Sequence, residues 1–505
     1  MPDHRDPRDR SARGISEEST GSRTEREYAP PYATRRRRVA VDAGPRRSAA
    51  GARADVDVLV AGAGAAGLTA ALAWAQRGAD VLLIDVQESF RHACNTALST
   101  GIIPAAGTRW QAAAGVEDSP ELFFRDALTK TAGSVERRLA RALTSVSAEV
   151  IEWLSDTAGV EFELVTEFRY PGHSLVRCHA TPGRTGQVLH GQLMAAIGAL
   201  SRVTLVAPIA LRDILLDEEG GVRGAVLGRP DASPEEVSTR HVVLATNGFG
   251  ANRALVTQHM PEIAAGLYFG GHGSTGDALA IGAALGADVA CLAAYQGHAA
   301  VAVPHGILVT WATVVHGGVL VNGHGRRFGD ESRGYSEYAA NVLAQPGGYA
   351  WLVLDRRIDR LCRPFVDYSN LVEAGALRWA ADARELADIV GADATAVEQT
   401  LRAAAACALN GTADVHGRRE WTAALEPPFG AVKVTGALFH TQGGLAVDEA
   451  ARVLRGGEPI PGLFAAGGAA VGMSGRDASG YLSGNGLLAA VGLGYLTTRG
   501  MAANA

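Results

Sequence analysis

Short apolar runs alternate along this chain with longer segments in which apolar residues recur every three or four positions. The runs 56–61 and 80–84 are typical of buried strands, and the alanine-rich segment 65–77 between them predicts a helix. Helical spacing continues over 120–158, 188–200, 273–287 and 384–409. Apolar runs predict further strands at 203–206, 210–216, 222–227, 241–245 and 351–354, the first three in a small antiparallel layer. The alternation predicts an α/β fold.

A glycine-rich turn joins the first predicted strand to the first predicted helix. Gly62 allows a tight turn, Gly64 lets the backbone approach a pyrophosphate, and Gly67 lets the helix pack closely on the sheet. The N–H groups at the start of that helix would hold the phosphates. Asp85 ends the second strand, where a carboxylate binds an adenosine ribose hydroxyl. The segment therefore predicts a dinucleotide site.

A second glycine-rich region lies close to the C-terminal end of the sequence. It comprises 461–468, with Gly467 and Gly468, and 480–488, which leads into an apolar stretch. A flavoprotein closes its cofactor site with such C-terminal backbone, so the two regions together predict FAD rather than a nicotinamide cofactor.

Composition narrows the class of protein further. Of the 505 residues, 47% are apolar, and the net charge of −6 argues against nucleic acid as the main partner. Since apolar runs stay shorter than the roughly 20 residues of a membrane span, we expect no such span. The five cysteines lack metal or iron–sulfur spacing, which favours a reducing cytoplasm. Residues 1–54, which include Arg35–Arg38, are polar and predict a disordered tail without a secretion signal.

After Asp55, nearly the whole chain resembles the flavoprotein subunits of the fumarate reductase and succinate dehydrogenase family, especially the soluble flavocytochrome type. The resemblance rests on motifs in a fixed order, at 57–67, 105–108, 118–123, 179–193, 244–249, 276–277, 318–322, 327–331, 440–444 and 461–467. These motifs are specific for the family and weakly specific for the substrate.

The resemblance implies a Rossmann-like FAD-binding domain with an inserted α+β capping domain. The FAD-binding domain would comprise 55–292 and 440–505, and the capping domain 293–439. The reaction implied is hydride transfer between flavin N5 and a carbon of a C–C bond. The segment 91–101 lacks the Ser-His-Thr attachment motif and His92 lies too early in it, so we expect non-covalent FAD.

The candidate cofactor-binding residues combine the two glycine regions with the matching family motifs. They are Gly62, Gly64, Ala65, Ala66, Gly67, Asp85, Asn95, Thr96, Ser99, Thr100, Gly101, Asn247, Gly248, Asp277, His440, Gly467, Gly468, Ser483, Asn485 and Leu487. The helix that begins near Ser483 would point its positive end at the flavin.

At the substrate positions this chain departs from the family. The family's proton-donating arginine falls on Tyr335, its carboxylate-clamping arginine on Tyr481, and its substrate histidine on Phe439. The proton-relay positions, usually Glu and Arg, are Trp311 and Val314. Burying a dicarboxylate without cationic partners costs several kcal/mol per ion. We therefore expect a small apolar or carbonyl-bearing substrate and a separate electron donor or acceptor.

Four side chains are the candidate catalytic residues: Tyr335, Tyr481, Ser483 and His298. Tyr481 and Ser483 could donate hydrogen bonds to a carbonyl and stabilise its enolate. This Tyr-x-Ser pair locally resembles the ketosteroid dehydrogenases of the wider superfamily. Tyr335 takes the position of the proton donor, and His298 keeps the family's residue type. The leading hypothesis is an FAD-dependent dehydrogenase or ene-reductase that acts on a CH–CH bond beside a carbonyl.

Two alternatives stay open. The chain could act on carboxylates as a fumarate reductase, with cations supplied by Arg333 or Arg476. It could instead be a flavin-binding electron-transfer subunit without a substrate of its own. Arginines lining the flavin ring would favour the first alternative, and a cap sealed by side chains would favour the second.

Overall fold

A computed structural model describes residues 55–230 and 232–499. These residues belong to one compact unit that extends over Ala54–Ala505. The tail predicted over 1–54 lies outside the described residues. Among the described residues, no helix combines the length and the apolar character needed to cross a membrane.

A six-stranded, mostly parallel sheet forms the core of the flavin-binding half. Its order is β20 (Arg452–Arg455), β21 (Glu458–Ala465), β10 (Val242–Leu244), β1 (Val58–Ala61), β2 (Val81–Ile84) and β6 (Val203–Val206), with only β20 antiparallel. Side chains of β1 and β10 are buried on both faces, which is why these strands read as continuous apolar runs.

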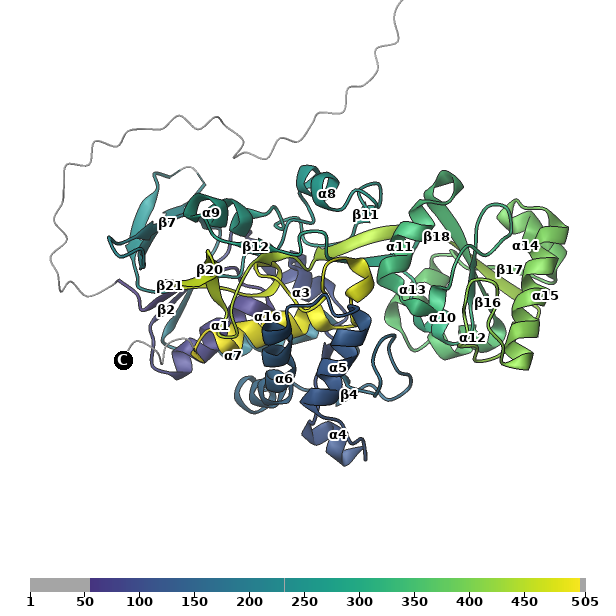
Figure 1. Ribbon diagram of the computed structural model, residues 1–505, viewed down its shortest axis with the longest axis horizontal. Coiled ribbons are helices and arrows are strands. Elements are labelled where there is room, and N and C mark those ends of the chain that lie inside the picture. The colour runs from purple at the N-terminus through teal and green to yellow at the C-terminus, as the bar shows by residue number, and fades with distance from the viewer. Residues whose placement is uncertain (1–54, 231, 500–505) are drawn as a thin grey trace, which may run out of the picture. The chain divides into compact units, whose positions relative to one another are not determined.

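Helices from distant parts of the chain cover this sheet (Figure 1). α1 (Ala65–Gln76) packs against α7 (Gly186–Gly198) and against α16 (Asn485–Leu496), and α16 also contacts α6 (Arg137–Ala158). α1 follows β1 directly, whereas α16 lies close to the other end of the chain. The two glycine-rich regions of the sequence therefore meet at the carboxyl ends of the parallel strands β1 and β21.

The turn between β1 and α1 depends on glycines. Gly62 has a φ of +114°, and a Cβ atom on Gly67 would lie 1.8 Å from the Gly62 carbonyl oxygen. Only glycine lets the helix approach the strand this closely, which confirms the packing role expected of Gly67.

Two smaller sheets flank the main one. β7 (Ala210–Leu216), β8 (Val222–Gly228) and β9 (Glu235–Ser238) form an antiparallel layer, and β3 (Ile103–Pro104), β5 (Cys178–Ala180) and β4 (Glu163–Leu164) form another. The expectation that 203–206 belongs to the antiparallel layer is wrong, because β6 pairs in parallel with β2. A four-residue apolar run does not specify which strand it pairs with.

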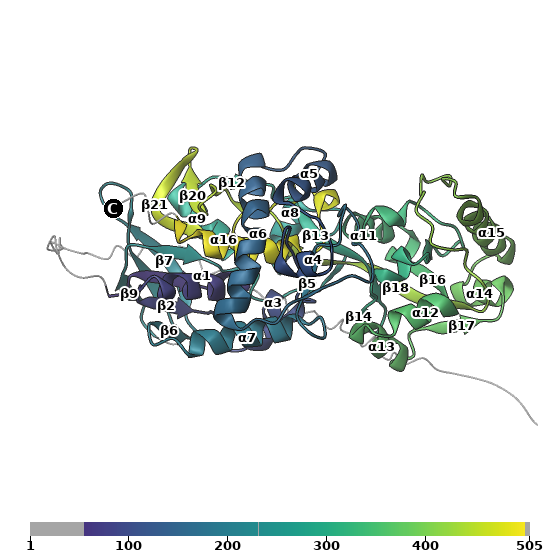
Figure 2. The ribbon, with the colours of Figure 1, turned by 90° about the horizontal axis from the view of Figure 1, so that it is seen from below.

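A seven-stranded sheet forms the core of the capping half. β14 (Ile307–Leu308), β13 (Tyr295–Ala302), β18 (Phe429–Thr441), β16 (Tyr349–Asp355) and β15 (Val319–Val321) lie in this order, and β11 (Leu267–Tyr268) and β17 (Arg378–Ala380) also pair with β18. β16 and β17 pair with opposite edges of β18, and Figures 1 and 2 both show these three strands in the half of the molecule away from β2 and β21. The expected fold class is confirmed, while the exact domain boundaries stay a prediction.

Helices of the capping half surround this sheet. They are α10 (Ala312–Val315), α11 (Tyr335–Leu343), α12 (Arg356–Cys362), α13 (Val366–Glu373), α14 (Ala383–Val390) and α15 (Ala394–Asn410).

A buried ion cluster fixes the turn before α11. Glu331, fully buried, pairs with Arg327 and with Arg418, and Arg327 also pairs with Asp414.

Two long helical predictions are each divided in the structure. The segment 120–158 contains α5 (Pro120–Lys130) and α6, separated where Ala132 and Gly133 adopt positive φ values of 47° and 76°. The segment 384–409 contains α14 and α15, separated at Gly391, which caps α14 in the left-handed conformation. Helical periodicity alone does not reveal such short interruptions.

Short elements complete the chain. They are α2 (Phe90–Ala93), α3 (Asn95–Leu98), α4 (Arg109–Ala113), α8 (Arg253–His259), α9 (Asp277–Leu285), β12 (Val289–Ala290), β19 (Gly444–Leu445) and the 3-10 turns Glu331–Arg333, Pro346–Gly348, Gly467–Ala469 and Ala478–Gly480.

The contact at Gly67 can be tested against a matched helical glycine. We expect Gly67→Ala to destabilise the protein by roughly 1–3 kcal/mol or more, because its Cβ atom overlaps the Gly62 carbonyl oxygen. Gly191, in the middle of α7, has no neighbouring atom within 4 Å of the place that a Cβ atom would take, so Gly191→Ala should stabilise by about 0.5–1 kcal/mol. The unfolding midpoints of the two variants, compared with that of the unchanged protein, measure these changes in stability. An unchanged midpoint for Gly67→Ala would contradict the packing argument.

Candidate active site

One large cavity lies between the flavin-binding half and the capping half. Its volume is about 1310 Å³, above the roughly 300–1,000 Å³ of a typical single-ligand site. The glycine turn after β1, the start of α16, the end of β18 and the start of α11 all line it. The cavity is therefore large enough for an extended cofactor together with a second molecule.

The dinucleotide end of the cavity is formed by the turn after β1. Asp85 accepts hydrogen bonds from the N–H groups of Ala63 and Gln87, both at 2.8 Å. Two accepted bonds leave further lone pairs on the carboxylate for a ribose hydroxyl. Burial raises the pKa of Asp85, and the two backbone hydrogen bonds counteract that shift.

Two helix N-termini at the cavity lack capping side chains. α1 begins after Gly64 and α16 after Gly484, and these N-cap glycines have no side chain to accept from the helix N–H groups, although at α1 Thr96 accepts from the N–H of Ala65. Uncapped N–H groups and the helix dipole favour a negatively charged group. A dinucleotide pyrophosphate at α1 and an electron-rich ring edge at α16 would satisfy them. These residues therefore fit FAD.

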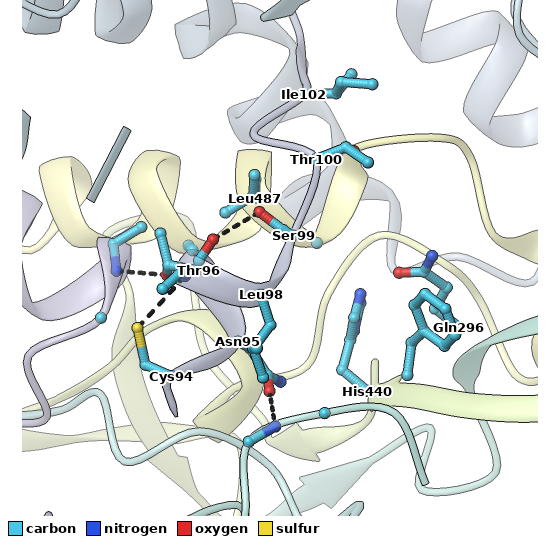
Figure 3. Close-up of a pocket in the computed structure, with 18 of the residues that line it drawn as sticks. Cys94, Asn95, Thr96, Leu98, Ser99, Thr100, Ile102, Gln296, His440 and Leu487 are labelled. Atoms are coloured by element: carbon cyan, nitrogen blue, oxygen red, sulfur yellow. Dashed lines mark hydrogen bonds between the residues drawn. The ribbon is translucent and has the colours of Figure 1, made fainter. Parts of the chain in front are cut away.

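Polar side chains between the two helix ends come from α3 and from the loop after β10. Figure 3 shows the Asn95 side chain accepting a hydrogen bond from backbone N–H, which is that of Gly271 at 2.6 Å. The Asn95 amide also donates to Asn247, whose own amide donates to Ser274 at 2.7 Å. Thr96 accepts from the Ala65 N–H at 2.9 Å and so holds the start of α1.

Most of the predicted cofactor residues line this cavity. They are Gly62, Gly64, Ala65, Ala66, Asp85, Asn95, Thr96, Ser99, Thr100, Asn247, Asp277, His440, Gly467, Gly468, Ser483 and Leu487. Gly67, Gly101, Gly248 and Asn485 are not among the lining residues, and each occupies a packing position behind them. A Cβ atom on Gly248, for example, would lie 1.8 Å from the Thr441 hydroxyl.

Asn485 reaches the cavity indirectly, through a buried chain of hydrogen bonds. Its amide donates to the Ser474 hydroxyl at 2.9 Å, and Ser474 donates to Gln442 at 2.8 Å. The Gln442 amide lies 3.1 Å from Nδ1 of His440, which lines the cavity. Burial lowers the pKa of His440 to about 4, so the ring is neutral near pH 7.

At the substrate end, side chains from both halves meet. Tyr335, the first residue of α11, donates from its hydroxyl to Ser483 Oγ at 3.0 Å. The Tyr335 and Tyr481 rings lie 6.0 Å apart in an edge-on arrangement. Burial raises the pKa of both phenols above their ordinary value. All three residues line the cavity, so the structure brings the predicted catalytic tyrosines and serine together.

His298 lies beside Tyr335 in an aromatic stack. Its ring centroid is 4.9 Å from that of Tyr335 and 5.4 Å from that of Phe439, and Trp311 contacts it edge-on at 5.8 Å. Its Nδ1 accepts from the Ala300 N–H at 3.1 Å, so the ring proton sits on Nε2. Burial lowers the pKa of His298 to about 3. The ring is therefore a neutral hydrogen-bond donor.

The sequence prediction missed the loop 165–177 and its neighbours. Phe168, Tyr170, Arg184 and Phe365 all line the cavity. Arg184 pairs with Glu167 and lies 5.5 Å from the Phe365 ring centroid, so it joins this loop to α13. These residues show no periodic pattern, and the positive φ of 52° at Arg184 becomes visible only in the structure.

Comparison with known proteins identifies this architecture. The FAD binding domain family matches residues 57–487. The chain belongs to the FAD binding domain family. FAD as the cofactor and the expected relationship to the fumarate reductases are therefore confirmed.

Three relatives illustrate how this FAD binding domain is used. An NADH:fumarate oxidoreductase from Klebsiella pneumoniae is 29% identical over 81% of this chain, which spans only 44% of that protein's length. The open form of a flavocytochrome c3 fumarate reductase is 27% identical to this chain and has a TM-score of 0.71. The match covers 87% of this chain and 77% of the fumarate reductase chain. A 3-ketosteroid-Δ4-(5α)-dehydrogenase from Rhodococcus jostii RHA1, in complex with 4-androstene-3,17-dione, is 26% identical, with 90% and 98% coverage and a TM-score of 0.70.

We expect Asp85→Asn to weaken FAD retention. The N–H groups of Ala63 and Gln87 donate to different oxygens of the carboxylate, so an asparagine would turn its NH2 group, a donor, toward one of them. The measurement is the flavin absorbance per protein after gel filtration. Asp217→Asn is the control, because Asp217 also accepts a backbone N–H, that of Gly221 at 2.8 Å, but is not among the residues lining the cavity. Equal retention in both variants would contradict this role for Asp85.

Proposed function

We propose that this protein is an FAD-dependent oxidoreductase that acts on a CH–CH bond adjacent to a carbonyl. The observation that carries the proposal is the Tyr335, Tyr481 and Ser483 cluster, which faces a cavity formed by an FAD binding domain. Bound FAD would supply or accept the hydride. The substrate would be an apolar or weakly polar molecule with a conjugated ketone, of the kind a ketosteroid represents.

The chemistry of the substrate end supports a neutral substrate. Tyr335, Tyr481, His298 and Phe439 are uncharged groups, since burial holds the phenols protonated and the imidazole deprotonated at neutral pH. A dicarboxylate buried there would lose its hydration without gaining a cationic partner, at a cost of several kcal/mol per ion. A ketone needs only hydrogen-bond donors, which the two phenols and the serine hydroxyl supply.

The roles of the side chains follow from their hydrogen bonds. Tyr481 and Ser483 would donate to the substrate carbonyl and stabilise negative charge on its oxygen. Tyr335 would move the proton at the carbon next to the site of hydride transfer. A phenol is protonated at neutral pH even at its ordinary pKa of about 10, and burial raises the pKa of Tyr335 further, so this residue carries a proton that it could deliver. The Ser483 hydroxyl lowers that pKa and would stabilise the phenolate that the reverse direction requires.

We also propose that the FAD is held without a covalent bond. His92, the histidine of the segment 91–101, is exposed and lies 3.0 Å from the Gln187 amide. It is not among the residues that line the cavity. A separate electron donor or acceptor and a cytoplasmic location stay predictions from the sequence.

The two alternatives find less support. Arg333 and Arg476, the cations that a carboxylate substrate would need, are not among the lining residues. The lining arginines are Arg184, paired with Glu167, and Arg360 on α12. An electron-transfer subunit without a substrate would not need a cavity of about 1310 Å³ that is lined by the phenols of Tyr335 and Tyr481.

Fumarate and other diacids should be poor substrates. The test is anaerobic reoxidation of the reduced protein by fumarate, compared with 4-androstene-3,17-dione and simpler cyclic enones. Because the arginine positions of the family are Tyr335 and Tyr481, we expect fumarate to react at least about 100-fold more slowly than the best enone, a difference of ~2.7 kcal/mol in barrier. Equal rates would overturn the proposal of a neutral substrate.

Tyr335→Phe should retain FAD and the fold but lower turnover by roughly 10²–10⁴-fold, the usual size of a general acid–base contribution. Tyr338→Phe is the matched control. Tyr338 lies on the same helix, is 1% exposed, and its hydroxyl is buried without a hydrogen-bond partner, so its removal should leave turnover unchanged. With chemistry shown to be rate-limiting, an unchanged rate in Tyr335→Phe would exclude Tyr335 as the proton-transfer group.

A further inference from the structure

His173 lies behind the substrate end of the cavity, in the loop between β4 and β5. Its side chain is almost completely buried, and its Nε2 lies 3.2 Å from the backbone carbonyl oxygen of Ser483. Because a carbonyl can only accept, the ring proton is on Nε2 and is donated to Ser483. Burial lowers the pKa of His173 to about 3, and the positive charge of Arg177 adds to this shift. The ring is therefore neutral, with its tautomer fixed.

The loop that carries His173 is held firmly against the segment 482–484. A Cβ atom on Gly172 would lie 2.7 Å from the Leu482 side chain, so the backbone approaches this segment closely. Arg177, which is fully buried, forms a two-pronged ion pair with Asp118 and lies 4.6 Å from the Phe123 ring. The His173 ring packs on that same phenylalanine, with centroids 5.9 Å apart.

The peptide group that His173 contacts joins Ser483 to Gly484, and Ser483 belongs to the proposed catalytic cluster. The Ser483 carbonyl receives the His173 hydrogen bond, and the Cys178 thiol lies 3.9 Å from the same oxygen. The backbone of Gly484, the other residue of this peptide, counteracts the rise that burial causes in the pKa of Tyr481. The Ser483 side chain accepts from Tyr335. The orientation of this peptide plane therefore influences where the Ser483 hydroxyl lies relative to Tyr335.

We propose that His173 is a positioning residue for the reaction: it orients the Ser483–Gly484 peptide and so places the Ser483 hydroxyl against Tyr335. The inference rests on the proposed function, because it assigns a reaction role to Ser483 and Tyr335. His173 itself is not among the residues lining the cavity, so it acts only through Ser483.

Two amide variants separate the hydrogen bond from the general effect of changing a buried histidine. A glutamine amide nitrogen reaches as far as imidazole Nε2, whereas an asparagine amide reaches only as far as Nδ1. His173→Gln should therefore keep the bond to Ser483, and His173→Asn should lose it. His179→Asn is the control at a second buried, neutral histidine, whose Nε2 contacts Thr108 at 2.8 Å and not Ser483.

The first measurement needs no substrate and uses the FAD-loaded protein. Amide hydrogen exchange of the peptide spanning 481–487 should become faster in His173→Asn than in the unchanged protein, and should stay slow in His173→Gln and His179→Asn. Equal exchange in His173→Asn and the unchanged protein would overturn the proposal. This outcome is distinct from failure of the proposed function, which would show as a protein that turns over no enone.

The second measurement is a double-mutant cycle on kcat for the best enone. His173→Asn should lower kcat by about 10- to 100-fold with little change in KM, as expected for a small misplacement of a reacting group. In a Ser483→Ala background the same change should cost less than about threefold, because the hydroxyl it positions is already gone. If the loss of kcat in the double variant equalled the product of the losses in the two single variants, His173 would not act through Ser483, and the proposal would be overturned.

Discussion

The carbonyl oxygen of Gly62 occupies the place where a side chain at position 67 would begin, and the flavin-binding half is arranged around this contact. It sets the distance between β1 and α1, and hence the direction in which the first N–H groups of α1 point. α16, from close to the other end of the chain, packs against α1 and brings a second uncapped helix start to the same cavity. Two positive helix ends thus face one ligand site, and FAD is the cofactor that satisfies both.

Desolvation decides the chemistry at the far end of the cavity. In water a phenol, an imidazole and a carboxylate can all carry charge at modest cost, but burial penalises every charged form. The phenols of Tyr335 and Tyr481 therefore stay protonated, and the imidazoles of His298 and His440 stay neutral. This end of the site works with hydrogen bonds and aromatic surface rather than with ion pairs. A cation introduced there would bring a large desolvation cost of its own.

Much of the flavin-binding half could be predicted because its information is local. The turn Gly62–Gly67 and Asp85 follow from spacing within one strand–helix–strand unit, and family motifs located Tyr335 and Tyr481. The parts that were missed depend on distant contacts. His173 and Tyr170 lie in an irregular loop that is pinned by Arg177 and Asp118, and no pattern around residue 173 indicates that its ring meets residue 483. The interruption at 131–136 was present in the sequence as Gly133, but helical spacing on both sides concealed it.

Apart from the short strand β11, the chain enters the capping sheet on β13 and leaves it on β18, and these two strands are neighbours in one antiparallel ladder, with Tyr295 opposite Thr441. The entry and exit points are therefore about 5 Å apart, the separation of paired residues in such a ladder. A segment whose two ends meet can be exchanged for another without moving the residues on either side of it. The capping half is thus joined to the rest of the chain like an insertion, and its interior can change in length or sequence while the strands that hold the cofactor site keep their places.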